Sequence, residues 1–508
     1  MMVLLTVLIP LAGGLLAAYA GKAGRNAPRW IAMASMAGVQ AITVILWLTG
    51  PRAGQVWYGQ VDAGWIAELG IRFHLALDGL SLLLVALTAF IGMAAVLSSW
   101  NEVTERTGFF HFNLLWCLAG ITGVFLSRDL FLFYVFWEIM LIPMYFLISV
   151  WGHEDRLRAA IKFFIFTQLS GLLMLTSILA LYFIHESRTG FFSFDYGDLL
   201  GLAIGPGTAA WLMAGFLAAF LVKLPVIGLH TWLPDAHTQA PTAGSVILAG
   251  LLLKTGAYGL LRFAVPLFPE AFPAMAPVMM VLATAGILYG AVLAFAQADI
   301  KRLVAYTSVS HMGFVLLGVF TYNEIALTGA MIQITCHALS TGALFMLAGG
   351  LAGRLNTRQM DQMGGFWRGA PRMGGMMMVF ALASLGLPGL GNFAGELLVL
   401  LGAYRANPVL ASVAALGFVV SAIYALWMMQ RVFFGRAAGT AAVSDLSVRE
   451  TATAAAMAAA LLVIGLYPQP IIDTTRPAIS ALKASSMVVN PDPIPNDVPE
   501  SGDRHARR

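Results

Sequence analysis

The chain has 508 residues, of which only 11% are charged and 59% are hydrophobic. An ordinary soluble domain has about 25% charged residues, and so little charge could not cover the surface of a soluble fold of this length. The same composition, with a formal net charge of only +4, excludes a disordered chain, a collagen, a coiled coil and a nucleic-acid-binding protein. The composition therefore predicts a polytopic membrane protein.

Apolar runs long enough to cross a bilayer need about 20 residues each. The runs are continuous rather than alternating, and an open sheet cannot face lipid, so each run is predicted to be a helix. The predicted fold is an all-α polytopic membrane protein with about fourteen transmembrane helices. The predicted spans lie near residues 2–20, 30–49, 77–99, 110–127, 130–150, 160–184, 209–232, 242–264, 276–297, 302–320, 325–353, 373–403, 409–434 and 450–467.

Lysine and arginine in the loops orient the spans, because cytoplasmic loops carry an excess of them. The loops after odd-numbered spans hold about 16: Lys22, Arg25, Arg29, Arg106, Arg156, Arg158, Lys162, Lys301, Arg302, Arg354, Arg358, Arg368, Arg372, Arg431, Arg436 and Arg449. The loops on the other face hold about six, namely Arg52, Arg72, Arg128, Arg188, Arg262 and Arg405. With an even number of spans, both termini are expected to face away from the cytoplasm.

Four ionisable residues lie well inside predicted spans: Glu138, Lys223, Lys254 and Glu396. Each costs about 2.5–3.5 kcal/mol at mid-bilayer on insertion scales, and four together approach the whole stability of a typical protein, about 5–15 kcal/mol. Each one alone could be a snorkelling or structurally paired residue. For all four that explanation is poor, so they are candidate functional residues.

Histidines add to this set. His311 and His337 lie within successive spans among hydroxyl side chains, and His230 and His237 flank the Trp232-Leu233-Pro234-Asp235 segment. A buried histidine among hydroxyls is often only a satisfied interhelical hydrogen bond. The other reading is a haem with two axial histidines, which the polar flanking residues disfavour.

Two predicted spans contain a proline that should break the helix. Pro225 follows Lys223 in the seventh span, and Pro388 interrupts the twelfth, which is too long for one helix across a 30 Å core. The two prolines are 163 residues apart in the sequence, and Tyr258 and Tyr424 on the following helices are 166 apart. This spacing predicts two inverted five-helix repeats with paired broken helices, as in transporters.

The repeats divide the chain into four predicted parts. Residues 1–109 hold spans one to three, 110–264 the first half-channel repeat (spans four to eight), and 276–434 the second (spans nine to thirteen). Residues 435–508 hold the last span and an extramembrane C-terminal tail, which is rich in proline from Pro491 to Pro499.

Three segments resemble a known family. They are Lys223-Leu224-Pro225 followed by the residues His230 to His237 and Ala240 to Val246, the run from Arg302 to His311, and the run from His337 to Ser340. Together they are similar to the proton-channel subunits of respiratory complex I and to the Mrp-type cation/proton antiporters, over roughly residues 75 to 435. Two features favour one member chain within the family. The first is Glu396, at a position where the sister chains of that member are expected to carry lysine. The second is that the chain ends after about fourteen spans.

The resemblance implies a proton-translocating subunit of an NADH–quinone oxidoreductase, coupled to NADH oxidation and quinone reduction elsewhere. It implies that Glu138 and Lys223 form the ion pair of the first half-channel, that Lys254 links the halves, that His311 and His337 are relay groups and that Glu396 faces the second half-channel. His230 and His237 belong to the matching segment and join the candidate residues.

The implied partners are the sister antiporter-like chains of the complex, through them the peripheral redox arm, and membrane lipid, but no nucleic acid. FMN, iron–sulfur clusters and quinone are expected in partner subunits, and no cofactor or metal in this chain, which has no dinucleotide fingerprint in a strand–helix context.

Three alternatives remain open from the sequence. The first is a stand-alone or Mrp-type sodium/proton antiporter, and the second is the equivalent subunit of a related hydrogenase or plastoquinone-reducing complex. The third is a structural scaffold whose buried charges only assemble the helices.

Overall fold

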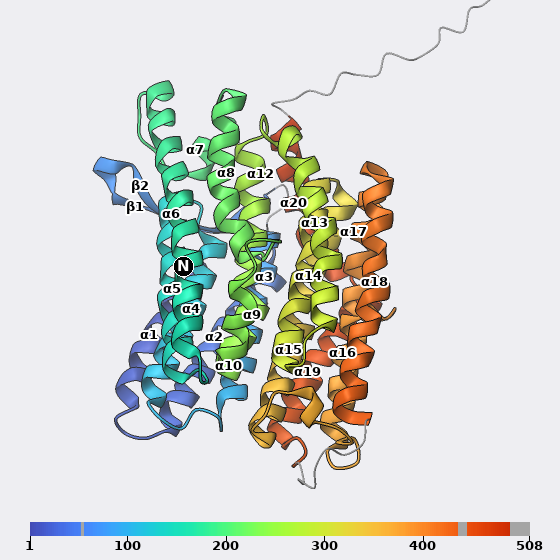
Figure 1. Cartoon of the computed structure of the whole chain (residues 1–508). Helices are drawn as coiled ribbons and strands as arrows, with labels where there is room; N and C mark the ends of the chain where they lie inside the picture. Colours follow the sequence, from blue (N-terminus) through green and yellow to red (C-terminus); the bar gives the residue numbers. More distant parts are fainter. Residues whose placement is uncertain (52–54, 435–443, 488–508) are drawn as a thin grey trace, which may run out of the picture.

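Long helices run side by side along a common direction in the computed structural model of the chain, which describes residues 1–51, 55–434 and 444–487 (Figure 1). Among these residues, 13 helical segments are long and apolar enough to cross a membrane. They are α1 (Met2–Ala20), α2 (Asn26–Thr49), α3 (Gly79–Ser99), α4 (Thr107–Leu126), α5 (Leu130–Trp151), α6 (Arg156–Thr189), α8 (Pro206–Lys223), α10 to α12 (Thr242–Leu267), α13 (Phe272–Phe295), α14 (Ile300–Thr321), α15 (Glu324–Leu355), α18 with its π-helical end (Pro408–Phe434) and α19 (Val448–Leu466).

Both predicted helix breaks are confirmed. Helix α8 ends at Lys223, two residues before Pro225, and the chain resumes as α9 (Trp232–Gln239). Helix α16 (Pro371–Ser384) ends before Pro388, and α17 begins only at Gly391 and runs to Ala406. The halves of this second broken helix have 14 and 16 residues, too short to count as spans alone, which is why 13 segments rather than fourteen qualify.

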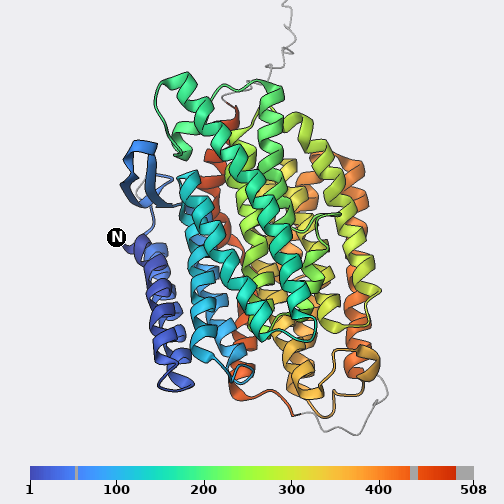
Figure 2. The same ribbon diagram turned by 60° about the vertical axis from the view of Figure 1, so that its left-hand side comes forward.

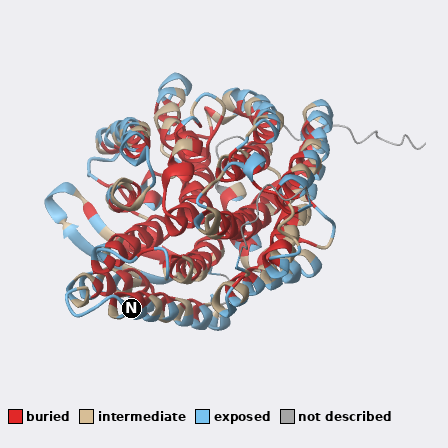
Figure 3. Cartoon of the chain, turned by 60° about the horizontal axis from the view of Figure 1, so that its bottom comes forward, coloured by how far each residue is buried: buried red, intermediate tan, exposed pale blue. Residues whose placement is uncertain are grey.

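The burial pattern separates central helices from peripheral ones. The Thr242–Leu267 segment is wholly buried within the protein, and α14 and α15 are nearly so. The outer faces of α6 and α18 expose large apolar side chains such as Leu169 and Val419. Viewed along the bundle, buried residues fill the middle and exposed residues form the rim (Figure 3). An apolar rim is what lipid or a neighbouring membrane subunit requires.

The central Thr242–Leu267 segment is not a regular α-helix. It contains two π-helical turns, Leu248–Leu252 and Leu260–Ala264, on either side of α11 (Leu253–Gly259), and α10 (Thr242–Ile247) and α12 (Val265–Leu267) flank them. A π turn inserts a residue and leaves carbonyl groups available, often at functional sites. Lys254 lies directly after the first of these turns.

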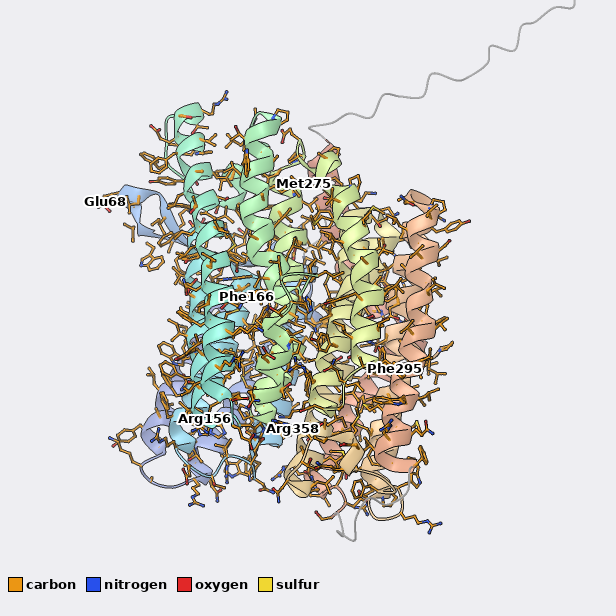
Figure 4. All side chains as sticks on the ribbon, viewed as in Figure 1. Glu68, Arg156, Phe166, Met275, Phe295 and Arg358 are labelled. Carbon is orange, nitrogen blue, oxygen red and sulfur yellow. The ribbon has the colours of Figure 1, made fainter. Side chains whose placement is uncertain are left out.

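Each of the two repeats contains a helix-capping aspartate that also forms an isolated β-bridge. Asp129 caps the start of α5 and forms an isolated β-bridge with Asp195, and Asp299 caps α14 and forms the same kind of bridge with Gln359. The first bridge lies near the end of the bundle that carries Glu68, and the second lies next to Arg358 at the other end (Figure 4). Equivalent bridges at opposite ends agree with two repeats of inverted orientation.

A β-hairpin outside the bundle was not predicted. Strand β1 (Tyr58–Ile66) pairs antiparallel with β2 (Ile71–Leu77), and the hairpin projects beside α1 (Figure 2). Apart from this hairpin, the described residues form helices and the segments that connect them. Strand β2 leads directly into Asp78, whose carboxylate caps α3 by accepting a hydrogen bond from Ser81 N at 2.9 Å.

The predicted placement of Arg262 in a loop is wrong. Arg262 lies in the second π turn, is only 3% exposed, and forms a fully buried ion pair with Asp78. Its guanidinium also lies over the Trp57 ring, 4.5 Å from the centroid. Arg262 therefore ties the hairpin region to the first repeat and is no guide to membrane orientation. Arg52 and Arg436, also used for orientation, lie outside the described residues.

A further helix, α20 (Gln469–Met487), follows the last span. It packs against the start of α3 and the bundle, since Thr475 is fully buried and Tyr322 donates its hydroxyl to the Leu482 carbonyl at 3.1 Å. The proline-rich part of the predicted tail, Pro491 to Pro499, lies outside the described residues.

Replacing Arg262 with alanine is expected to destabilise the protein by about 3–5 kcal/mol, because Asp78 would remain as an unpaired buried charge. Replacing Arg72, whose pair with Asp62 is partly exposed, should cost only about 0–1 kcal/mol. Melting temperature and yield of the purified complex measure both. Equal effects of the two replacements would contradict this assignment.

Asp129 gives a pH-dependent prediction outside the spans. Burial raises the pKa of Asp129 to about 6 even though backbone N–H groups of Leu132 and Arg72 bond to its carboxylate. A raised folded-state pKa means that its protonation stabilises the fold fully below the ordinary value of 3.8 and no longer does so above about 6. Asp129→Asn, which keeps a capping side chain, should therefore be at least as stable as the natural chain at neutral pH.

Asp129→Ala is the matched comparison, because it removes the cap as well as the charge and should lower the melting temperature. A lower melting temperature for Asp129→Asn at neutral pH, equal to that of the alanine variant, would show that the carboxylate itself is required.

Candidate functional site

The second repeat brings His311 and Glu396 together in its interior. His311 Nδ1 lies 2.8 Å from Glu396 Oε1, and both side chains are only 2% exposed. Gln333 donates its Nε2 to the same carboxylate oxygen at 2.7 Å. The three side chains come from α14, α17 and α15, respectively. This is a buried carboxylate with two hydrogen-bonding partners, as a charge at this depth needs.

The other ring nitrogen of His311 has hydroxyl neighbours. Nε2 lies 3.0 Å from Ser384 Oγ and 3.2 Å from Tyr424 OH. Ser384 is the last residue of α16, so the helix break places its hydroxyl at the histidine.

Lys254 and His337 form the second pair. Lys254 Nζ lies 2.6 Å from His337 Nδ1, and both residues are fully buried. The ammonium group also donates to the carbonyl of Ala249, five residues earlier in the adjoining π turn. The π turn therefore holds the lysine side chain against α15, where His337 lies.

The two pairs meet at the histidines. The rings of His311 and His337 lie edge to face with centroids 5.7 Å apart. Lys254, His337, His311 and Glu396 thus form one continuous buried line across four helices. The sequence predicted that Lys254, the two histidines and Glu396 act together, without an order for the histidines; in the structure His337 contacts Lys254 and His311 contacts Glu396.

The first repeat is different, because Glu138 and Lys223 form no direct ion pair. Lys223 Nζ and Glu138 Oε1 are both buried without a hydrogen-bonding partner in the described part of the chain. The ammonium instead lies between two aromatic rings, 5.4 Å from the Trp137 centroid and 5.2 Å from that of Phe163. Aromatic faces attract a cation, so they offer it a partial substitute for a carboxylate.

His230 and His237 occupy the segment between the first repeat and Lys254. His230 lies in the break after α8 with its ring against Tyr289 and Tyr306. His237 lies in α9, stacks on Phe345 with centroids 4.3 Å apart, and has neither ring nitrogen bonded. In the described part of the chain, neither histidine forms a hydrogen bond with Lys254, His337, His311 or Glu396.

A polar cavity of about 830 Å³ lies at the end of the bundle where Arg358 is found. It is bounded by parts of both repeats and by the ends of α3 and α19, and Lys301, only 1% exposed, lies in its wall. Lys301 donates to the carbonyl of Ala240 at 3.1 Å, in the turn that precedes α10. The cavity thus approaches the segment that carries His237.

Sequence reasoning missed Gln333, Ser384 and Lys301 as parts of the site, and it used Tyr424 only as a mark of the repeat. Nothing local distinguishes these polar residues from ordinary interhelical hydrogen-bonding groups. Asp78 could have been found, because an aspartate immediately before an apolar run is a helix-capping signal.

Comparison with known proteins identifies the class. A family described as NADH:quinone oxidoreductase/Mrp antiporter, TM, matches residues 127–423. The NADH-quinone oxidoreductase subunit M of Pseudomonas aeruginosa is 50% identical over 490 residues, covering 94% of this chain and 96% of the relative. A chain of respiratory complex I from Thermus thermophilus with bound NADH is 34% identical, with a TM-score of 0.86, covering 96% of this chain and all of that one.

The Mrp complex from Dietzia shares the fold, with a TM-score of 0.82 at 22% identity over 96% of this chain and 52% of that one. The chain belongs to the NADH:quinone oxidoreductase/Mrp antiporter membrane family. Within it, the chain falls with subunit M of NADH-quinone oxidoreductase, and is an antiporter-like, proton-translocating membrane subunit of bacterial complex I. Glu396 led to the prediction that this chain is the family member with glutamate at that position rather than a lysine-bearing sister chain. The match to subunit M confirms that prediction.

The site does not suit a haem between His311 and His337. Both nitrogens of His311 face Glu396 and the hydroxyl pair, and Nδ1 of His337 faces Lys254. An axial ligand needs a free ring nitrogen aimed at the iron. The hydrogen bonds fit a line of proton-exchanging groups better.

The Lys254–His337 contact predicts a reciprocal effect on stability. Replacing His337 with leucine leaves a buried lysine with one partner fewer and is expected to destabilise the protein by up to about 3–5 kcal/mol. Adding Lys254→Met to that variant should recover part of the loss, since the buried amine is then gone. The melting temperatures of the two single variants and the double variant test this coupling. Additive losses in the double variant would mean that the two side chains do not depend on each other.

Proposed function

We propose that protons cross this subunit through Lys254, His337, His311 and Glu396, in that order, after entering by way of Glu138 and Lys223. The observation that carries the proposal is the continuous buried line from Lys254 to Glu396. Each member can gain or lose a proton, and each is within hydrogen-bonding distance or one ring-to-ring step of the next. A structural scaffold would need paired charges but no such ordered line.

In the first repeat, Lys223 is the group that loads and releases the proton. Burial disfavours a charged lysine, whereas a nearby carboxylate and aromatic faces favour it. When Lys223 lies apart from Glu138, as in the arrangement described above, it can pass its proton onward. When the two approach, Lys223 takes up a proton again. A change elsewhere in the complex, driven by quinone reduction, would alternate these arrangements.

Carbonyl groups at the two helix breaks and the π turns would support the charge between these steps. Non-helical backbone is tolerated at membrane depth where it lines a cavity or packs against protein. In this proposal the two repeats are half-channels, residues 110–264 for entry and 276–434 for exit. Residues 1–109 and 435–508 flank them.

The proposed orientation places the basic end of the bundle, with Arg156 and Arg358, in the cytoplasm (Figure 4). Both termini then face the periplasm, and Glu396 releases the proton toward that side. The subunit would lie in the bacterial inner membrane as a multi-pass protein.

The partners in this proposal are the sister antiporter-like chains and, through them, the peripheral arm in which FMN, iron–sulfur clusters and quinone carry the electrons. The apolar rim of the bundle provides contact surface for those chains and for lipid. In this proposal the residues of this chain exchange only protons.

Glu138→Gln and Lys223→Ala are each expected to lower proton pumping by at least about tenfold while the complex still assembles, because a positioned proton-transfer group typically contributes about 10²–10⁴-fold. Protons pumped per NADH oxidised, measured in sealed membrane vesicles, give the result. Glu68→Gln, in the exposed turn of the hairpin, is the matched control.

Full proton stoichiometry in both variants would remove Glu138 and Lys223 from the path. Loss of assembly without loss of pumping by the assembled fraction would instead favour the scaffold.

A further inference from the structure

His311 is held on three sides by polar groups from three other helices. Nδ1 faces Glu396, and Nε2 faces the hydroxyls of Ser384 and Tyr424. These two hydroxyls lie 3.4 Å from each other, and both side chains are at most 2% exposed. Among the described residues, the hydroxyls of Ser384 and Tyr424 form hydrogen bonds only with His311 and with each other.

The direction of each hydrogen bond follows from the partners. Glu396 Oε1 already accepts a hydrogen bond from Gln333, as an ionised carboxylate does. His311 Nδ1 therefore carries the hydrogen and donates it to Oε1. In a neutral imidazole the other nitrogen then has only a lone pair, so Nε2 accepts from one of the two hydroxyls.

We propose that Ser384 and Tyr424 are positioning residues for proton transfer, fixing His311 so that a proton can load only at Nε2 and leave only from Nδ1. This inference rests on the proposed function of the relay. The step is balanced within the line: an N–H bond breaks on protonated His337 and one forms at Nε2 of His311, the Nδ1–H bond of His311 breaks, and an O–H bond forms on Glu396. The hydroxyl that donated to Nε2 turns to donate elsewhere in the pair. Once Glu396 has released its proton, tautomer exchange in the ring breaks the Nε2–H bond and re-forms the Nδ1–H bond, which restores the starting state.

A hydroxyl both donates and accepts, so the pair can serve Nε2 whether or not that nitrogen carries a hydrogen. Without both hydroxyls Nε2 would be buried with no partner, and the ring would no longer be held with Nδ1 toward Glu396. A hydrogen bond at one ring nitrogen is a known way to orient a histidine. One remaining hydroxyl can still donate to Nε2, so the two residues are expected to substitute partly for each other.

The first repeat has no equivalent arrangement. Tyr258, which the repeat spacing pairs with Tyr424, donates its hydroxyl to the carbonyl of Phe125 at 2.9 Å and lies near Ser81 and Arg262. Tyr258 thus also contacts a buried serine hydroxyl, but among the described residues only the Ser384–Tyr424 pair faces a histidine, and it is this placement that a general packing role would not require.

The experiment compares Ser384→Ala, Tyr424→Phe and the double variant in the intact complex. Protons pumped per NADH oxidised and coupled turnover are measured in sealed vesicles, and Tyr404→Phe, at an exposed tyrosine of α17, is the control. Each single variant should lose about twofold or less, and the double variant at least about tenfold. Restoring one hydroxyl, as Ser384→Thr with Tyr424→Phe, should return pumping to the level of the Tyr424→Phe single variant.

Two results would overturn this inference. One is a double variant that pumps and turns over like the natural complex. The other is a loss in Ser384→Thr with Tyr424→Phe as large as in Ser384→Ala with Tyr424→Phe, because threonine keeps the hydroxyl and such a loss would reflect packing alone.

Glu396→Gln, measured alongside, separates this inference from the proposed function. If Glu396→Gln pumps normally, the relay itself is wrong. If Glu396→Gln loses pumping while the hydroxyl variants do not, only the positioning role of Ser384 and Tyr424 fails.

Discussion

A charge in the middle of a bilayer must find its partners inside the protein, and the architecture of this subunit follows from that requirement. Lys254 can lie at the centre only because a π turn offers it a carbonyl and α15 offers it His337. Glu396 is retained because His311 and Gln333 bond to it. Lys223, for which the described residues provide no such bonding partner, rests against aromatic rings. The buried charges are therefore held with unequal strength, which suits groups that must exchange protons.

The irregular parts of the backbone also help to provide hydrogen-bonding partners for the buried polar groups. Ser384 reaches His311 because α16 stops there, and Lys254 reaches Ala249 because the preceding turn is π-helical. In a regular helix each carbonyl already accepts a backbone N–H from the next turn, so it can offer a charged side chain only a shared hydrogen bond. The breaks at Pro225 and Pro388 are thus part of the site rather than interruptions of the membrane spans.

Much of this could be predicted from the sequence. Continuous apolar runs located the spans, prolines located the breaks, and the cost of buried charge singled out Lys223, Lys254 and Glu396, which the structure buries. Side-chain pairing could not be predicted, because it depends on how helices far apart in the sequence face each other. For that reason the expected Glu138–Lys223 ion pair is not a direct one, Arg262 is buried rather than in a loop, and Gln333 and Ser384 were not assigned to the site. The hairpin was missed because two short alternating strands are a weak signal beside long apolar runs.

The central claim is that Lys254 connects the two halves of the path. The most direct test is the number of protons pumped per two electrons by the intact complex carrying Lys254→Met, in sealed vesicles with assembly verified. The account predicts a clear fall in that ratio or in coupled turnover, with the complex still assembled. An unchanged ratio at normal turnover would contradict it.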